Sequence, residues 1–217
     1  SYVDPVQNPG PQGTVVGLDP AGTPVTGTDD KRMRANFIVG PQFSASGARL
    51  GDDGFDATDP DGKPFTFTPY INQLEPGAWR QSGARIGKWQ FYLGMTESLD
   101  NDFAIFRYSD ILLTKAEATA RKLADWNDAG VLAVVNQIRT QHGGVTPFAT
   151  LTAATFLAER SREMFAEAWK RQDMIRFGTF NSAYLFHSAD ADTHVNIFPI
   201  PSTQIDANKN LKQNPGY

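Results

Sequence analysis

An abrupt change of pattern near residue 102 limits the folds open to this chain more than any other feature. Residues 1–102 hold most of the glycines and prolines, and turn sequences such as Pro-Asp-Gly-Lys at 60–63 recur too often for long helices. From residue 103 onward, apolar residues recur at helical spacing. The sequence therefore predicts a loop-rich, aromatic part over residues 1–102 and a helical part over residues 103–217, which together form one domain.

The helical part is predicted to begin with a hairpin of two helices. The first begins near Phe106 and lasts roughly four turns, with an apolar stripe formed by Tyr108, Leu112, Ala116, Ala120 and Leu123. The second presents Val131, Val134, Val135 and Ile138 and ends at the glycines of 143–144. Small alanines opposite larger aliphatic residues let two helices approach closely, as in tetratricopeptide units. Because one pair cannot form a solenoid alone, further pairs are expected upstream.

Two more helices and a short strand are predicted from local signals. A third helix begins with Thr152 as its N-cap and continues to Trp169. A short helix then runs through 174–177 and stops at Gly178. The alternating residues of 65–68 indicate a strand. The expected fold class is mainly α, with long irregular loops and few short strands.

Composition excludes several classes of function. The net charge is -4, with lysines and arginines scattered along the chain, so no basic footprint for nucleic acid is present. No run of about 18 apolar residues occurs, so any membrane attachment has to come from elsewhere. The absence of cysteine excludes disulfides, thiolate metal sites and cysteine nucleophiles. The opening residues resemble neither a start methionine nor a targeting segment, so the chain is expected to begin inside a longer precursor.

The candidate chemical groups point away from catalysis. Carboxylates that a glycosidase could use alternate with arginines three or four residues away, which favours ion pairs over a general acid; they are Glu159, Glu163, Glu167 and Asp173. His187, Asp190, Asp192 and His194 lack the spacing of an established metal motif. The acidic loop 52–62 departs from the EF-hand pattern, although its oxygens could ligate calcium. We predict no catalytic residue, metal or cofactor and keep calcium at 52–62 as an alternative.

Aromatic residues in the loop-rich part are the best candidates for ligand binding. Rings on ordered loops can stack on the apolar faces of sugars. The candidates chosen on this ground are Phe55, Tyr70, Trp79 and Trp89. Burial in the core is the alternative for each ring.

Three stretches, 101–118, 159–178 and 199–217, resemble the SusD/RagB family of nutrient-binding lipoproteins of Bacteroidetes in order and spacing. The second follows the family pattern of Glu-Arg, Glu, Glu, Arg, Asp and Arg before Phe-Gly, but Ala168 stands where the family has glycine. This departure is expected to affect packing and not ligand binding. The third stretch looks like the usual C-terminal ending of the family.

The resemblance implies a non-enzymatic protein that captures oligosaccharides and delivers them to a SusC-like TonB-dependent transporter. It also implies an outer-membrane location on the extracellular face, through a lipid anchor on a cysteine that this chain lacks. The alternatives are a RagB-like peptide-binding protein, a glycoside hydrolase, and an interaction module that contacts only a protein partner.

Overall fold

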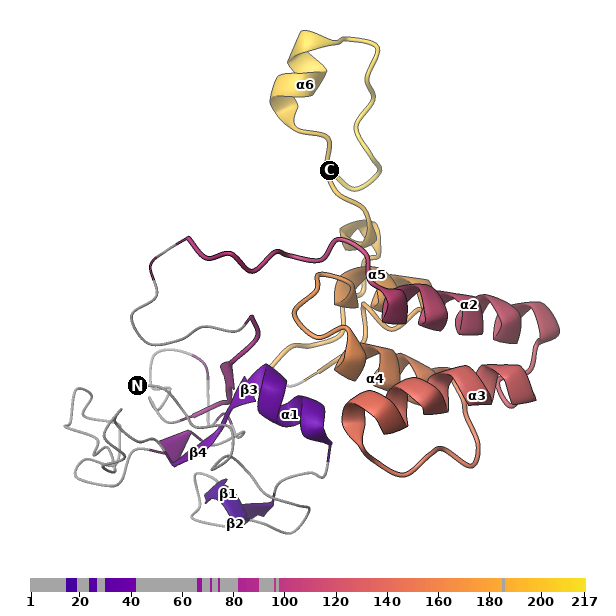
Figure 1. Cartoon of the computed structure of the whole chain (residues 1–217). Coiled ribbons are helices and arrows are strands. Elements are labelled where there is room, and N and C mark those ends of the chain that lie inside the picture. Colours follow the sequence, from indigo (N-terminus) through magenta and orange to yellow (C-terminus); the bar gives the residue numbers. More distant parts are fainter. Residues whose placement is uncertain are drawn as a thin grey trace. The chain divides into compact units, whose positions relative to one another are not determined.

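The computed structural model describes residues 15–18, 24–26, 30–41, 66–67, 71, 74, 82–89, 96, 98–184 and 186–217. The chain divides into two compact units, Ser1–Ala168 and Trp169–Tyr217. Helices make up most of the regular structure in the described part of the chain, which confirms the mainly helical fold class (Figure 1). The predicted division at residue 102 stays a prediction. Within the described ranges, no helix has the length and apolar content needed to cross a membrane.

Short antiparallel strand pairs form the described β-structure of the first unit. The pairs are β1 (Val15–Leu18) with β2 (Pro24–Thr26), β3 (Phe37–Ile38) with β6 (Arg85–Ile86), and β4 (Gly40–Pro41) with β5 (Thr66–Phe67). Strand β5 confirms the strand predicted at 65–68. Helix α1 (Lys31–Asn36) precedes β3 and begins where the Asp30 side chain accepts a hydrogen bond from the backbone N–H of Arg32.

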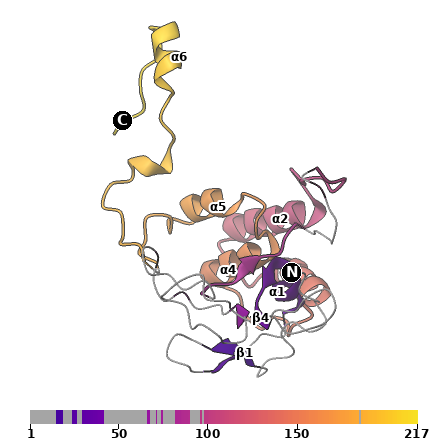
Figure 2. The ribbon, with the colours of Figure 1, turned by 90° about the vertical axis from the view of Figure 1, so that its left-hand side faces the viewer.

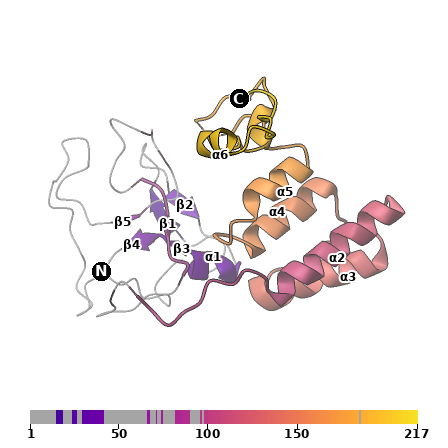
Figure 3. The ribbon, with the colours of Figure 1, turned by 90° about the horizontal axis from the view of Figure 1, so that it is seen from above.

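The predicted hairpin consists of α2 (Tyr108–Leu123) and α3 (Ala129–Ile138), which lie side by side (Figure 3). Asp128 caps α3 by accepting hydrogen bonds from the N–H groups of Gly130 and Val131. A π-helical turn, Arg139–Gly143, continues α3 and ends at Gly144, whose φ of 68° is left-handed. The hairpin and its glycine end are therefore confirmed.

The buried face of α2 differs from the predicted stripe. Ala116 and Ala120 are buried as expected, but Tyr108 is 74% exposed and Leu123 is 51% exposed. Leu113 is buried instead, together with polar residues of the same face. Asp110 can be buried because its carboxylate accepts a hydrogen bond from Arg160 of α4 at 2.8 Å. The apolar pattern was wrong for Tyr108 and Leu123 because it could not count buried polar residues as part of the core face.

Helix α4 (Ala153–Glu163) lies beside α2 and α3 (Figures 1 and 2). Thr152 caps it in a reciprocal capping box with Thr155, which confirms the predicted start. The predicted end at Trp169 is wrong, because the helix stops at Glu163. Ala166 and Ala168 then adopt left-handed φ values of 60° and 63°. A glycine is favoured at such a position, so the departure at Ala168 affects backbone conformation.

The second unit contains α5 (Lys170–Arg176), the 3-10 turn η2 (His194–Asn196) and α6 (Ser202–Ala207). Helix α5 ends at Arg176 with Phe177 as its C-cap, and Gly178 follows with a φ of 69°, so the predicted stop at Gly178 is confirmed. The C-terminal stretch ties its own backbone together through side chains. Gln213 bonds both the N–H and the C=O of Ile200, and Asn214 and Tyr217 donate to the carbonyls of Phe198 and Ile197. These bonds give the third family-like stretch a structural role.

Candidate functional site

A network of ion pairs around buried carboxylates lies in the described part of the first unit. Glu159 is fully buried and contacts three arginines, Arg32 at 2.7 Å, Arg139 at 2.8 Å and Arg162 at 2.8 Å. Only Arg162 belongs to the same helix as Glu159. The predicted ion pairs on and between helices are confirmed, with partners from α1 and from the turn after α3.

The network continues along the chain to Glu163 and Glu167. Arg107 bridges them, contacting Glu163 at 2.7 Å and Glu167 at 2.6 Å. Arg32 also reaches Glu163, Lys88 contacts Glu167, and Nδ1 of His142 lies 2.8 Å from Glu163. Arg107 Nη2 also donates to the backbone carbonyl of Glu163, where α4 ends.

Electrostatics keep two carboxyl groups of this network ionised. Burial alone would raise the pKa of Glu163, but the hydrogen bonds from Arg107 and His142 outweigh it and hold the pKa below the ordinary value. The pKa of Asp30 is lowered in the same way, since its bonds to Arg32 outweigh burial. A general acid needs a raised pKa at neutral pH, so this electrostatic setting does not suit acid catalysis.

A cavity of about 620 Å³ adjoins the network. Its polar lining consists of Asp30, Arg32, Asn36, Arg139, Ser161 and Arg162. Its apolar lining consists of Met33, Phe37, Ala84, Val145 and Phe165. Ligand pockets typically combine such an apolar wall with a few hydrogen-bonding groups, so this cavity is the candidate binding site.

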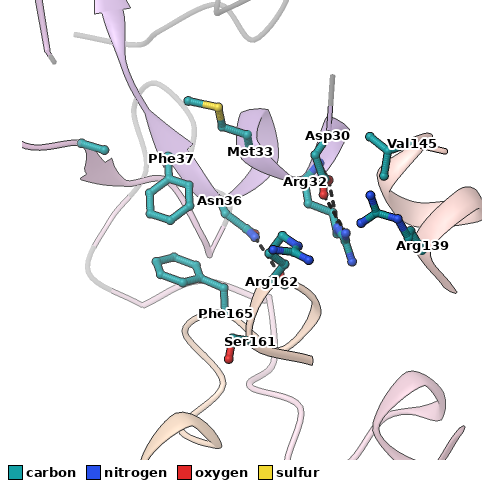
Figure 4. A pocket seen from close by; sticks show the side chains of 11 residues that line it. Asp30, Arg32, Met33, Asn36, Phe37, Arg139, Val145, Ser161, Arg162 and Phe165 are labelled. Atoms are coloured by element: carbon teal, nitrogen blue, oxygen red, sulfur yellow. Dashed lines mark hydrogen bonds and ion pairs between the residues drawn. The ribbon is translucent and has the colours of Figure 1, made fainter. Parts of the chain in front are cut away.

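Figure 4 shows Phe37 and Phe165 on one side of the cavity and Arg32 and Arg139 on the other, with Arg162 between them. The rings of Phe37 and Phe165 face each other with centroids 4.4 Å apart and an angle of 44° between their planes. The guanidinium groups of Arg139 and Arg162 lie toward Arg32. The guanidinium of Arg139 also stacks 4.1 Å from the ring of Phe148, which helps to hold its position. An apolar ring surface and several N–H donors can therefore contact one ligand.

Of the four aromatic candidates predicted from the sequence, only Trp89 lies in the described part of the chain, and it does not line this cavity. Phe55, Tyr70 and Trp79 lie outside the described residues, and so does the acidic loop 52–62. Trp89 is half-buried, with its ring 5.2 Å from that of Phe103 and 5.0 Å from Lys88 Nζ. Its role in ligand binding stays a prediction.

The cavity residues were missed because their signals are weak in sequence. Phe165 was assigned to the apolar face of a longer helix, and Phe37 has no neighbouring aromatic residue that would mark it. Arg162 was recognised only as one of the arginines that alternate with the carboxylates of 159–173, and Arg139 was not singled out. Pairing of Phe37 with Phe165 depends on the fold alone.

The histidines of the second unit form two separate pairs. His187 lies 3.8 Å from Asp190, and His194 lies 2.8 Å from Asp192. Among the described residues, no group of three or more potential ligands lies close enough to hold a metal ion.

Comparisons with solved structures define the class of fold. A SusD-like protein from Bacteroides fragilis superimposes with a TM-score of 0.57 at 20% identity, covering 87% of this chain and 39% of that one. The surface glycan-binding protein A from Bacteroides uniformis gives a TM-score of 0.56 at 17% identity, covering 98% of this chain and 47% of that one. The fold is therefore SusD-like.

Sequence comparison then shows the family. Residues 76–217 match the SusD family, and this chain belongs to it. The starch-binding protein SusD of Bacteroides thetaiotaomicron is 30% identical over 149 residues, which is 62% of this chain and 26% of that protein. The chain thus spans about a quarter of the length of this curated relative.

Proposed function

We propose that this chain is part of a cell-surface protein that binds oligosaccharides and passes them, chemically unchanged, to a SusC-like TonB-dependent transporter. The observation that carries the proposal is the similarity to a starch-binding protein, at 30% identity over 149 residues. A lipid anchor outside this chain would hold the protein on the extracellular face of the outer membrane.

The state of the carboxylates supports binding without turnover. A glycosidase needs two carboxyl groups on either side of the scissile bond, one of them protonated as the acid. Glu159, Glu163 and Glu167 each contact guanidinium groups, and the pKa of Glu163 is lowered. These groups suit a structural role better than the role of a proton donor.

A second candidate function, contact with a protein partner only, is favoured by the surface around the start of α2. Ile105, Tyr108 and Ile111 are 71%, 74% and 55% exposed. Large exposed apolar groups close together are typical of protein contacts. Substituting Tyr108→Asp should weaken capture of the transporter if this surface serves a partner.

The test is a glycan and peptide array on the intact protein, with calorimetry and product analysis of every hit. We expect saturable binding of one glycan class and no new reducing ends. Binding of peptides alone would favour a RagB-like function. Release of shorter sugars would show a hydrolase, and binding to neither class would leave the protein-contact function.

A further inference from the structure

Three arginines that line the cavity share one buried carboxylate as their counter-ion. Arg32, Arg139 and Arg162 come from different elements and all contact Glu159, at 2.7, 2.8 and 2.8 Å. All three line the cavity, whereas Glu159 is fully buried and does not. The carboxylate therefore holds the guanidinium groups from behind, and a ligand in the cavity meets the arginines.

Positive charge is in excess around this wall. Ion pairs join Arg32, Arg139 and Arg162 to Asp30, Glu159 and Glu163. Glu163 is shared with Arg107, which also contacts Glu167 together with Lys88. Among the arginines, lysine and carboxylates of the described network, five cations face four carboxylates, so one positive charge lacks a counter-charge there. A bound anion would supply it.

Two of the arginines keep hydrogen-bond donors for a ligand. Arg139 uses Nε for the carbonyl of Thr146 and Nη1 for Glu159. Arg162 uses Nε and Nη2, both for Glu159. In the part of the chain that the structure describes, Nη2 of Arg139 and Nη1 of Arg162 have no hydrogen-bond partner. Guanidinium N–H groups form strong hydrogen bonds with carboxylate and sulfate oxygens.

The two aromatic rings of the cavity favour a ligand that also has an apolar face. Phe37 and Phe165 offer ring faces and edges beside the arginines (Figure 4). An apolar sugar face can pack on such rings. The volume of about 620 Å³ falls within the range of small-ligand pockets.

We propose that this cavity binds an acidic sugar, with its carboxylate or sulfate group on Arg139 and Arg162 and its ring against Phe37 and Phe165. This inference rests on the proposed glycan-binding function and names its ligand class. Neutral sugars lack the anion that the free donors and the unbalanced charge require.

Calorimetry on the intact protein tests the charge requirement with matched probes. The probes are tetragalacturonate, its uncharged methyl ester, a sulfated oligosaccharide, neutral maltoheptaose and the acidic peptide tetraglutamate. We expect tetragalacturonate or the sulfated sugar to bind at least about tenfold more tightly than the neutral probes, with affinity falling as salt rises. The two acidic sugars tell a carboxylate site from a sulfate site.

Arginine variants locate the binding. Arg162→Gln should weaken binding of the acidic sugar about tenfold or more, and Arg139→Gln should act in the same direction. Arg176→Gln is the matched control. The side chains of Arg176 and Arg162 are 39% and 43% exposed, and each pairs with a buried carboxylate three residues earlier, Asp173 for Arg176 and Glu159 for Arg162. Arg176 does not line the cavity, so its variant should bind normally. Unfolding curves of each variant check that it folds.

The outcomes separate this inference from the proposed function. Equal binding of tetragalacturonate and its ester, or normal binding by both Arg162→Gln and Arg139→Gln, would overturn the acidic-sugar site. Binding of maltoheptaose alone would overturn it too but leave glycan capture intact. Binding of tetraglutamate alone would overturn both.

Discussion

The two compact units of this chain are stabilised in different ways. In the described part of the first unit, apolar side chains such as Leu113, Val135 and Phe156 are fully buried, and the carboxylate network lies among them. In the described part of the second unit, Asp173 is the residue that reaches comparable burial. That unit relies on side chains bonded to its backbone, as Gln213 is to Ile200.

The difference shows where a substitution should be costly. Removing one partner of a buried ion pair leaves an uncompensated charge in the protein interior, which lowers stability. The stability of a unit held by exposed contacts should change little when a charge is removed and more when a substitution strains the backbone. The comparison would fail if exposed charges of the second unit proved as costly to remove as buried charges of the first.

The largest effect is expected for Glu159→Gln. The substitution leaves Arg32, Arg139 and Arg162 without their shared charge, and we expect the free energy of unfolding to fall by about 3–5 kcal/mol. Urea unfolding measures it. The control is Asp206→Asn, which removes an exposed pair with Lys209 and should cost under about 1 kcal/mol. Equal losses would break the comparison.

A smaller effect is expected for Gly216→Ala in the second unit. Gly216 has a φ of 94°, and an added Cβ would lie 2.4 Å from Cβ of His194. Backbone strain and steric overlap together should lower the stability of the second unit by about 2–3 kcal/mol. Faster amide exchange over residues 194–217 would measure this loss. The control is Gly178→Ala, where φ is 69° but no atom lies within 4 Å of the new Cβ. If both variants lose the same stability, contact with His194 does not matter.

Acidification should weaken the first unit through Glu163 and Asp30. Their pKa values are lower in the folded protein than the ordinary values of 4.5 and 3.8, so the unfolded chain takes up protons first. The stability from these groups is complete above the ordinary values and is lost as pH falls through the lower folded values. Amide exchange against pH measures it for each unit. Earlier loss of protection in the second unit would contradict this expectation.

The smallest effect is expected for Ala168→Gly, at the last residue of the first unit. The φ of 63° strains a residue with a Cβ, so glycine should raise the free energy of unfolding by up to about 1 kcal/mol. The control is Ala118→Gly in exposed mid-helix of α2, which should lower it by about 1 kcal/mol. Thermal unfolding compares the two, and a loss at both positions would show that Ala168 is unstrained.

Local signals predicted much of the helical fold. The bounds of α2, the Thr152 cap and the stop at Gly178 depend on residues within a few positions of one another. The end of α4 was mispredicted because the apolar pattern continues past Glu163. In the structure, the backbone carbonyl of Glu163 accepts a hydrogen bond from Arg107, which lies 56 positions earlier in the sequence. Periodicity carries no information about a partner so distant in sequence.

The candidate site shows the same limit. The sequence indicated that the carboxylates of 159–173 pair with arginines, but Arg32 reaches Glu163 across 131 positions. The aromatic candidates were chosen from a crowded loop region, whereas the described cavity takes its rings from Phe37 and Phe165. Trp89 alone among those candidates lies in the described part of the chain.

By itself the sequence determined the mainly helical class, the hairpin of α2 and α3, the ionic character of the 159–173 stretch and the resemblance to the family, because periodicity, capping and motif spacing are local properties. Only the tertiary structure decided which arginines surround Glu159, which face of α2 is buried and which two rings share a cavity. The physical reason is burial: a charged group or a ring becomes buried only where segments distant in sequence supply its hydrogen-bond or packing partners.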